Sequence, residues 1–251
     1  MTGAEDWFVP MADVDGVRLY AFPHAGAGCA QLADFAQAAG EHGVSVWAAN
    51  LPGRQARLKE IPRTDFTGLT EELAEALADL LDGTPYAVFG YCGGALLAYG
   101  VIHRLRTMGA PLPVHLVVAS YDAPDITRRP RELSGLPPES FWRYLGESGG
   151  VPPALAADPR LRQVAEPALR ADFAVLASYR HEVNPPLPTR ITVCFGERDE
   201  ETRRGALLGW RRHTAEPVGL RGLDAGHWLL DDACAELAAA IADSLPGGES
   251  R

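Results

Sequence analysis

The feature that most constrains the fold of this chain is the alternation of short apolar runs with longer segments of helical periodicity. Runs typical of buried strands occur at 18–23, 44–49, 86–89, 114–120, 190–195 and 218–223. Between or after them, apolar residues recur at helical spacing in 29–40, 69–81, 93–108 and 231–245. This alternation is typical of βαβ units, and it predicts an α/β fold with a mostly parallel sheet covered by helices on both faces.

Composition limits the class of protein further. With 251 residues, 47% of them hydrophobic, the chain can bury the core of one large domain. No apolar run approaches the roughly 20 residues that a membrane crossing needs. The net charge of -10 argues against a nucleic-acid partner, because phosphate binding needs a positive face. The first fifteen residues lack the basic and apolar regions of an export signal, so we expect a cytoplasmic protein.

Four cysteines are present, and their spacing indicates neither a disulfide framework nor a zinc site. Cys29, Cys92, Cys194 and Cys234 form no CxxC pair. In a reducing compartment such thiols stay unpaired. At least one of them therefore calls for another explanation.

One long segment interrupts the alternation. Residues 125–188 are rich in Pro and Arg, and their helical pieces, 139–145, 160–164 and 168–180, have no strand between them. Insertions of this length in a compact domain are usually functional lids. We therefore expect an α/β core made of 1–124 and 189–251 and a helical lid made of 125–188. Phe141, Trp142, Tyr144 and Leu145 would form the underside and interior of that lid.

A glycine-rich turn between a predicted strand and a predicted helix carries one of the cysteines. Gly90-Tyr91-Cys92-Gly93-Gly94 fits the nucleophile elbow G-x-S-x-G with Cys in place of Ser. The sharp turn strains the central residue, and its neighbours must lack side chains to avoid collision. Alone, the motif is also compatible with a small buried cysteine in an ordinary turn.

A base and an acid follow the elbow in the order typical of the α/β-hydrolase fold. Asp199 comes after the strand 190–195, and His227 comes after the strand 218–223. His227 would accept the proton of the Cys92 thiol, and Asp199 would orient the imidazole. Three other acids remain open for the role of Asp199 because they lie close in sequence: Glu197, Glu200 and Asp224.

The same chemistry requires donors for the oxyanion of a tetrahedral intermediate. In this fold they are the backbone N–H after the nucleophile and one from the loop after an early strand. These positions are Gly93 and Ala25, the latter within Phe22-Pro23-His24-Ala25-Gly26. The loop matches neither G-x-G-x-x-G nor the P-loop, so it is not a nucleotide site.

With these residues in view, the chain resembles the type II thioesterases, free-standing α/β-hydrolases of polyketide and nonribosomal peptide synthesis. The resemblance runs from about Arg18 to Leu245, and its most specific part is the lid segment 167–179. Further matching segments are Phe22-Pro23-His24-Ala25-Gly26-Ala27, Pro52-Gly53-Arg54, the elbow, Gly196 to Asp199, and Gly226-His227. It implies a mostly monomeric enzyme without metal or organic cofactor that cleaves acyl groups from phosphopantetheine thiols of acyl or peptidyl carrier proteins.

The elbow departs from the family's usual Gly-His-Ser-Met-Gly. Here the nucleophile and both of its neighbours differ. Acyl transfer from pantetheine to Cys92 exchanges one thioester for another, and the product is a better donor to amines than a serine ester. A thiol paired with an imidazole is also a strong nucleophile near neutral pH. Alternatives to hydrolysis are therefore an acyltransferase or lactam-forming cyclase and an inactive carrier-binding protein.

Clustered arginines are candidates for steering an acidic carrier protein to this acidic chain. They are Arg128-Arg129-Pro130-Arg131, at the start of the predicted lid, and Arg203-Arg204 with Arg211-Arg212, near the predicted acid. Either cluster could contact the pantetheine phosphate. An ordinary solvated arginine surface is the alternative, which we favour.

Overall fold

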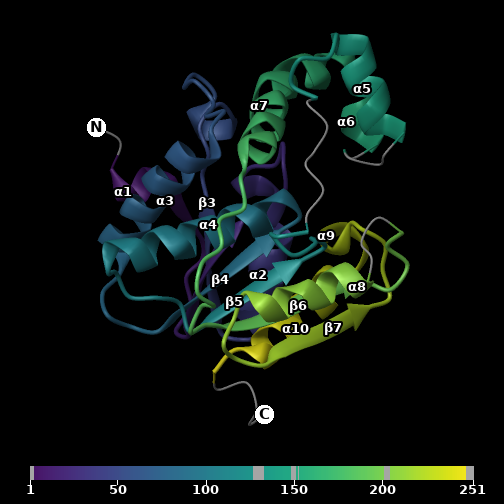
Figure 1. Ribbon diagram of the computed structural model, residues 1–251. Helices are drawn as coiled ribbons and strands as arrows, with labels where there is room; N and C mark the ends of the chain where they lie inside the picture. Colours follow the sequence, from purple (N-terminus) through teal and green to yellow (C-terminus); the bar gives the residue numbers. More distant parts are fainter. Residues whose placement is uncertain (1–2, 127–132, 148–150, 152, 201–203, 247–251) are drawn as a thin grey trace.

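A computed structural model describes residues 3–126, 133–147, 151, 153–200 and 204–246 (Figure 1). Its described strands form one sheet in the order β1-β3-β2-β4-β5-β6-β7. Neighbours are parallel except β1, which pairs antiparallel with β3 at one edge. The strands are β1 (Phe8–Ala12), β2 (Val17–Phe22), β3 (Val44–Ala49), β4 (Tyr86–Tyr91), β5 (His115–Ala119), β6 (Arg190–Gly196) and β7 (Val218–Leu223).

Helices cover both faces of this sheet (Figure 1). One face packs against α1 (Ala4–Trp7), α3 (Phe66–Leu80) and α4 (Gly93–Met108). The other packs against α2 (Ala33–Glu41) and α10 (Cys234–Ser244). In β3, β4, β5 and β6, successive residues point to opposite faces and are mostly buried on both, which explains why these strands read as continuous apolar runs. The predicted fold class is confirmed.

The edge strand β1 is absent from the sequence-based prediction. It contains Pro10, and the register shifts between Pro10 and Ala12. Proline cannot donate to a ladder and is confined to edges or irregular positions, so a strand containing it gives a weak sequence signal. An edge position is what the structure shows.

The sequence pattern of 69–81 favours Thr70 as the N-cap of α3, and that prediction is wrong. The helix begins at Phe66, and Asp65 is its N-cap, with Oδ2 accepting the Gly68 N–H at 2.8 Å. Thr70 lies inside the helix and is 1% exposed. Its hydroxyl donates to the Phe66 carbonyl at 2.9 Å instead of capping.

Two predicted helices are each divided in the structure. Residues 29–40 form a 3-10 helix, Cys29–Leu32, and then α2. Residues 231–245 include parts of α9 (Leu229–Asp232) and α10, which are separated at Ala233. Other short elements are the 3-10 helices Gln55–Arg57 and Leu208–Arg212 and the helix α8 (Arg204–Leu207).

The segment between β5 and β6 contains α5 (Pro138–Glu147), α6 (Pro153–Ala157) and α7 (Pro159–Ser178). Figure 1 shows α5 and α6 projecting away from the sheet, with α7 leading back to it. The helices expected at 160–164 and 168–180 are one continuous helix, with Pro167 inside α7. None of the helices in the described ranges combines the length and apolar character needed to cross a bilayer.

Candidate active site

Cys92 lies in the turn between β4 and α4 with a strained backbone. Its φ of 50° and ψ of -126° are unusual for a residue with a side chain. A Cβ at Gly90 would lie 2.4 Å from the Ala95 Cα, and one at Gly94 would lie 2.3 Å from the Phe22 carbonyl oxygen. The two glycines are therefore required by close backbone contacts, and the turn has the geometry of a nucleophile elbow.

His227 and Asp199 meet at the carboxyl ends of β7 and β6. His227 Nδ1 lies 3.0 Å from Asp199 Oδ2, and the two side chains are 18% and 1% exposed. A Cβ at Gly196 would lie 2.0 Å from the Gly226 carbonyl oxygen, so the two loops approach each other only because Gly196 is glycine. The Arg198 N–H also donates to the Ala225 carbonyl at 3.0 Å. These contacts fix the acid relative to the base.

The other acids considered for this position face solvent. Glu197 and Glu200 are exposed. The Asp224 side chain is 87% exposed and forms an ion pair with Arg198. Asp199 is the acid that the structure brings to His227.

His227 is protonated more readily than an ordinary histidine. Burial lowers the pKa of the ring, but hydrogen bonds to Asp199 and Cys92 and the charges of these two groups outweigh burial and raise the pKa to about 10. The imidazole thus lies between the carboxylate and the sulfur. A ring in this position can exchange a proton with the thiol while the acid holds its orientation.

Two hydroxyl groups that the sequence analysis missed hold the base loop in place. The Tyr91 hydroxyl donates to the His227 carbonyl at 3.0 Å, and the Ser120 hydroxyl donates to the same oxygen at 3.1 Å. Tyr91 is part of the elbow motif, but its hydrogen-bond partner His227 is 136 residues away, so the motif does not indicate this contact. Ser120 carried no motif signal.

Ala25 and Gly93 both line one small cavity. Its apolar walls are Leu51, Leu97, Val175 and Leu176. In the described part of the chain, the backbone N–H groups of Ala25 and Gly93 donate to no protein acceptor. Two unpaired donors beside the elbow can stabilise a developing oxyanion.

The other three cysteines differ from Cys92 in their surroundings. Burial raises the pKa of the Cys29 thiol to about 11 and that of Cys194 to about 12. Burial also raises the pKa of Cys234. All four are free thiols, and in the described ranges no group of three or more His, Cys, Asp or Glu residues could hold a metal ion.

The lid residues singled out from the sequence lie mainly in a separate core. Phe141, Trp142 and Leu145 are buried in an apolar cluster of the inserted helices. Tyr144 packs against that cluster and is partly buried. The Trp142 indole N–H donates to Glu166 Oε2 at 2.6 Å. These contacts account for the aromatic spacing as packing between α5 and α7.

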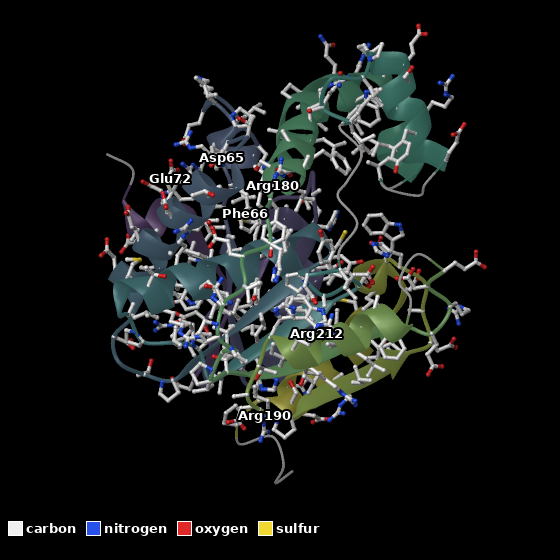
Figure 2. The ribbon with its side chains drawn as sticks, in the orientation of Figure 1. Asp65, Phe66, Glu72, Arg180, Arg190 and Arg212 are labelled. Atoms are coloured by element: carbon white, nitrogen blue, oxygen red, sulfur yellow. The ribbon has the colours of Figure 1, made fainter. Side chains whose placement is uncertain are left out.

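Most of the candidate arginine side chains lie outside the described part of the chain. Arg128-Arg129-Pro130-Arg131 and Arg203 lie outside the described residues, as does the side chain of Arg204. Arg212, labelled in Figure 2, lies 2.6 Å from Asp125 Oδ2 in an ion pair. Asp125 Oδ1 also lies 2.9 Å from His213 Nε2. Arg212 is thus engaged within the protein, whereas Arg211 is exposed.

The fold and the order of the site residues define the class of the protein. Cys92, Asp199 and His227 follow β4, β6 and β7 of a mostly parallel sheet, an arrangement characteristic of α/β-hydrolase proteins. Residues 17–245 match the Thioesterase domain family. The chain belongs to that family, and the resemblance drawn from the sequence is confirmed at this level.

Relatives with known names carry the comparison further. Gramicidin S biosynthesis protein GrsT of Aneurinibacillus migulanus is 30% identical over 227 residues, covering 89% of this chain and 88% of the relative. The RedJ thioesterase of the prodiginine pathway in Streptomyces coelicolor has a TM-score of 0.84 and 30% identity, covering 91% of this chain and 85% of that one. The type II thioesterase BorB of the borrelidin cluster has a TM-score of 0.85 and 27% identity, covering 97% and 99%.

Proposed function

We propose that this chain is a type II thioesterase that releases acyl groups from the phosphopantetheine thiols of carrier proteins in polyketide or nonribosomal peptide synthesis. Cys92 is the nucleophile, His227 the base and Asp199 the residue that orients it. Ala25 and Gly93 supply the oxyanion donors. The observation that supports this most directly is the position of His227 between the Asp199 carboxylate and the Cys92 sulfur.

In the first half of the reaction, the acyl group moves to the protein. His227 accepts the thiol proton, and the Cys92 sulfur attacks the thioester carbonyl carbon. The carbonyl electrons move onto the oxygen, where the N–H groups of Ala25 and Gly93 donate to it. The bond to the pantetheine sulfur then breaks, and that sulfur takes the proton from His227. The hydrogen bond between His227 and Cys92 places the ring where it can carry this proton.

In the second half, water replaces Cys92 on the acyl group. His227 accepts a proton from water, the oxygen attacks the acyl-enzyme carbonyl, and the bond to Cys92 breaks. The proton returns to the sulfur, and the free acid leaves. The scheme uses only water and side-chain and backbone groups of one copy of the chain, so we propose a monomeric enzyme that requires neither metal nor organic cofactor.

A second candidate, transfer of the acyl group to an amine, is favoured by one observation. Cys92 occupies the elbow position where the family usually has serine. A thioester reacts with amines more readily than an oxygen ester, so an acyl-Cys92 intermediate suits an acyltransferase or a lactam-forming cyclase.

The proposed carrier partner rests on the names of the relatives and on the family. GrsT, RedJ and BorB are named for biosynthetic pathways or clusters. An acidic carrier would meet a chain whose net charge is -10, so contact requires a local basic surface. The exposed Arg211 is one described candidate for it.

The test is incubation with acyl-loaded carrier proteins, with and without amines, followed by mass spectrometry of carrier and products. We expect the free carrier thiol and the free acid from the wild type and no release above background from Cys92→Ala. Cys234→Ala is the matched control, because it removes another partly exposed thiol that has no part in the proposed scheme, and it should retain full activity. An amide product only would favour the second candidate, and an unchanged acyl carrier would contradict both.

A further inference from the structure

A buried ion pair joins the inserted helix α7 to the loop after β3. Arg54 Nη1 lies 2.6 Å from Asp172 Oδ2, and Arg54 Nη2 lies 2.6 Å from Asp172 Oδ1. The side chains are 8% and 11% exposed. The two residues are 118 positions apart, and each belongs to a segment that the sequence analysis singled out without assigning a role. A bidentate ion pair of this kind fixes the relative orientation of the two side chains as well as the distance between them.

The same pair also holds the loop that contains Ala25. Asp172 Oδ2 accepts the Gly26 N–H at 2.6 Å, and Arg54 Nη1 donates to the Ala27 carbonyl at 2.9 Å. Gly26 has a φ of +82°, and a Cβ there would lie 2.4 Å from Leu169 Cδ1 of α7. The Ala25–Gly26 and Ala27–Gly28 peptide units are therefore fixed by side chains from other parts of the chain.

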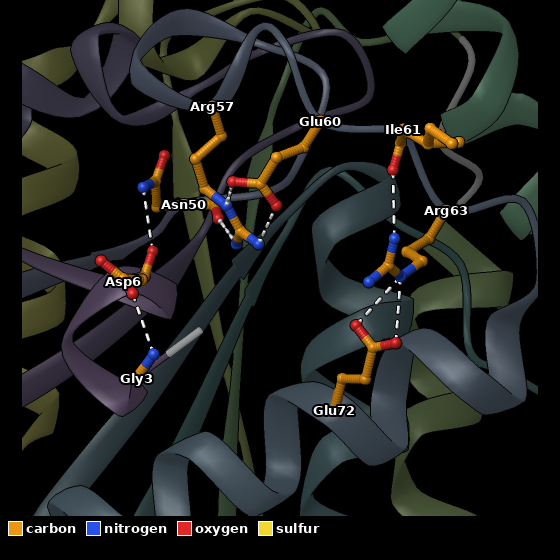
Figure 3. A network of polar contacts seen from close by, with 8 residues as sticks. All are labelled: Gly3, Asp6, Asn50, Arg57, Glu60, Ile61, Arg63 and Glu72. Carbon is orange, nitrogen blue, oxygen red and sulfur yellow. Dashed lines mark hydrogen bonds and ion pairs between the residues drawn. The ribbon is translucent and has the colours of Figure 1, made fainter. Parts of the chain in front are cut away.

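The loop that presents Arg54 is itself rigidly held (Figure 3). Arg57 Nη1 donates to the Asn50 carbonyl at 2.8 Å, and Arg57 Nη2 donates to Glu60 Oε2 at 2.6 Å. Further along, Arg63 Nε donates to Glu72 of α3 at 3.0 Å. These hydrogen bonds hold the loop that carries Arg54 in one conformation.

The location of this network distinguishes it from an ordinary structural ion pair. Asp172 lines the same cavity as Ala25 and Gly93. The Ala25 N–H lies one residue before the Gly26 N–H that Asp172 accepts. The orientation of this loop determines the direction of the Ala25 N–H. Oxyanion stabilisation depends strongly on donor direction, so the pair can control the reaction without touching substrate.

We propose that Asp172 and Arg54 are positioning residues that hold the Ala25 N–H toward the oxyanion, so that the inserted helix α7 completes the oxyanion hole. The inference rests on the proposed function, because it assumes that Cys92 is acylated. It assigns a role in catalysis to a segment outside the α/β core.

The test compares two reactions of Cys92 in the full chain, each located by peptide mapping. Acylation by an acyl-pantetheine thioester passes through an oxyanion, whereas alkylation by iodoacetamide is a direct displacement at carbon and forms none. For Asp172→Asn we expect the acylation rate at saturating substrate to fall by roughly 10- to 10³-fold, as for loss of an oxyanion donor. The KM should change little, and the alkylation rate should stay within about twofold.

Two further variants are included, one in case Asp172→Asn does not fold and one as a control for the loss of a carboxylate from α7. Arg54→Lys retains the charge beside Asp172 but removes the planar fork, so it should fold even if Asp172→Asn does not, and it should slow acylation selectively. Glu166→Gln is the matched control, because it neutralises another carboxylate of α7 that pairs with Arg170, at 2.8 Å, in the inserted segment. It should leave both rates unchanged.

The results distinguish a positioning role of Asp172 and Arg54 from a general structural role and from failure of the proposed function. A parallel loss of acylation and alkylation would overturn the proposal, because it would show a general structural role. Unchanged acylation in Asp172→Asn or Arg54→Lys would overturn it as well. If the wild-type protein is alkylated but never acylated, the proposed function fails first, and that result is distinguishable because it does not involve the variants.

Discussion

At the level of single residues, the reactivity of Cys92 depends on contacts that its neighbours in sequence do not supply. The elbow gives the sulfur its position, but His227 and Asp199 come from loops more than 100 residues later. The sequence could predict these residues from their order after strands. It could not decide among the nearby acids, because only the fold shows that Asp199 is buried against the ring while Asp224 is exposed.

Replacement of Asp199 tests the role of the acid. Asp199→Asn keeps the shape of the side chain but removes the charge that holds the protonated ring, so we expect kcat/KM to fall by about 10²-fold or more. Steady-state release of acyl groups from an acyl-pantetheine substrate measures this. Asp224→Asn, an exposed acid on the adjacent loop, is the control and should stay within about twofold. Equal losses in the two variants would rule out a specific role for Asp199.

At the level of secondary structure, the sequence located most elements but missed ends that depend on tertiary contacts. The strand β3 and the helix α4 have the predicted bounds. By contrast, α7 continues through Pro167, although proline removes a helix hydrogen bond. Leu169 and Leu176, on the following turns, are buried, and their packing outweighs that loss. No local pattern reveals such packing, nor the pairing of Arg54 with Asp172.

The N-terminal end of α3 is hydrogen-bonded to the end of α7; Figure 2 labels Asp65 and Phe66 at the start of α3 and Arg180 just after α7. The Phe66 N–H donates to the Ser178 hydroxyl at 2.8 Å. Since Asp65 is the N-cap, Asp65→Ala should lower the free energy of unfolding by about 1 kcal/mol. Urea unfolding followed by circular dichroism measures the difference.

The control for this capping prediction is Glu75→Ala. Glu75 is an exposed acid in the interior of the same helix, so its removal should change the free energy of unfolding by less than about 0.5 kcal/mol. An Asp65→Ala protein as stable as the control would show that the cap does not stabilise α3.

At the level of the whole molecule, neutral histidines that are buried or half-buried link stability to pH. Burial is the main cause that lowers the pKa of His24, His103 and His115 to about 4. Below the ordinary value of 6.5, the unfolded chain binds protons that these folded groups do not. Their stabilising contribution is therefore complete above about pH 6.5 and decreases as the pH falls toward 4. His227 acts in the opposite sense, because its raised pKa adds stability below 6.5 that is lost as the pH rises through about 10.

The clearest single test of this linkage uses His115, which is 1% exposed and lies 2.8 Å from Thr192 Oγ1 through Nε2. His115→Gln keeps a polar group but cannot titrate. Between pH 7 and pH 4.5, we expect the wild type to lose about 2 to 3 kcal/mol more unfolding free energy than the variant. Urea titrations at both pH values give this difference. Parallel losses would contradict the buried neutral state of His115.

The central step of the proposed reaction is transfer of the acyl group to Cys92. The most direct test is intact-mass spectrometry of the protein seconds after mixing with an acyl-loaded carrier protein, followed by peptide mapping. We expect a mass increase of one acyl group on the peptide that contains Cys92, its decay with release of the acid, and its absence in Cys92→Ala. Acyl release by Cys92→Ala at the wild-type rate, or an adduct on another residue, would contradict it.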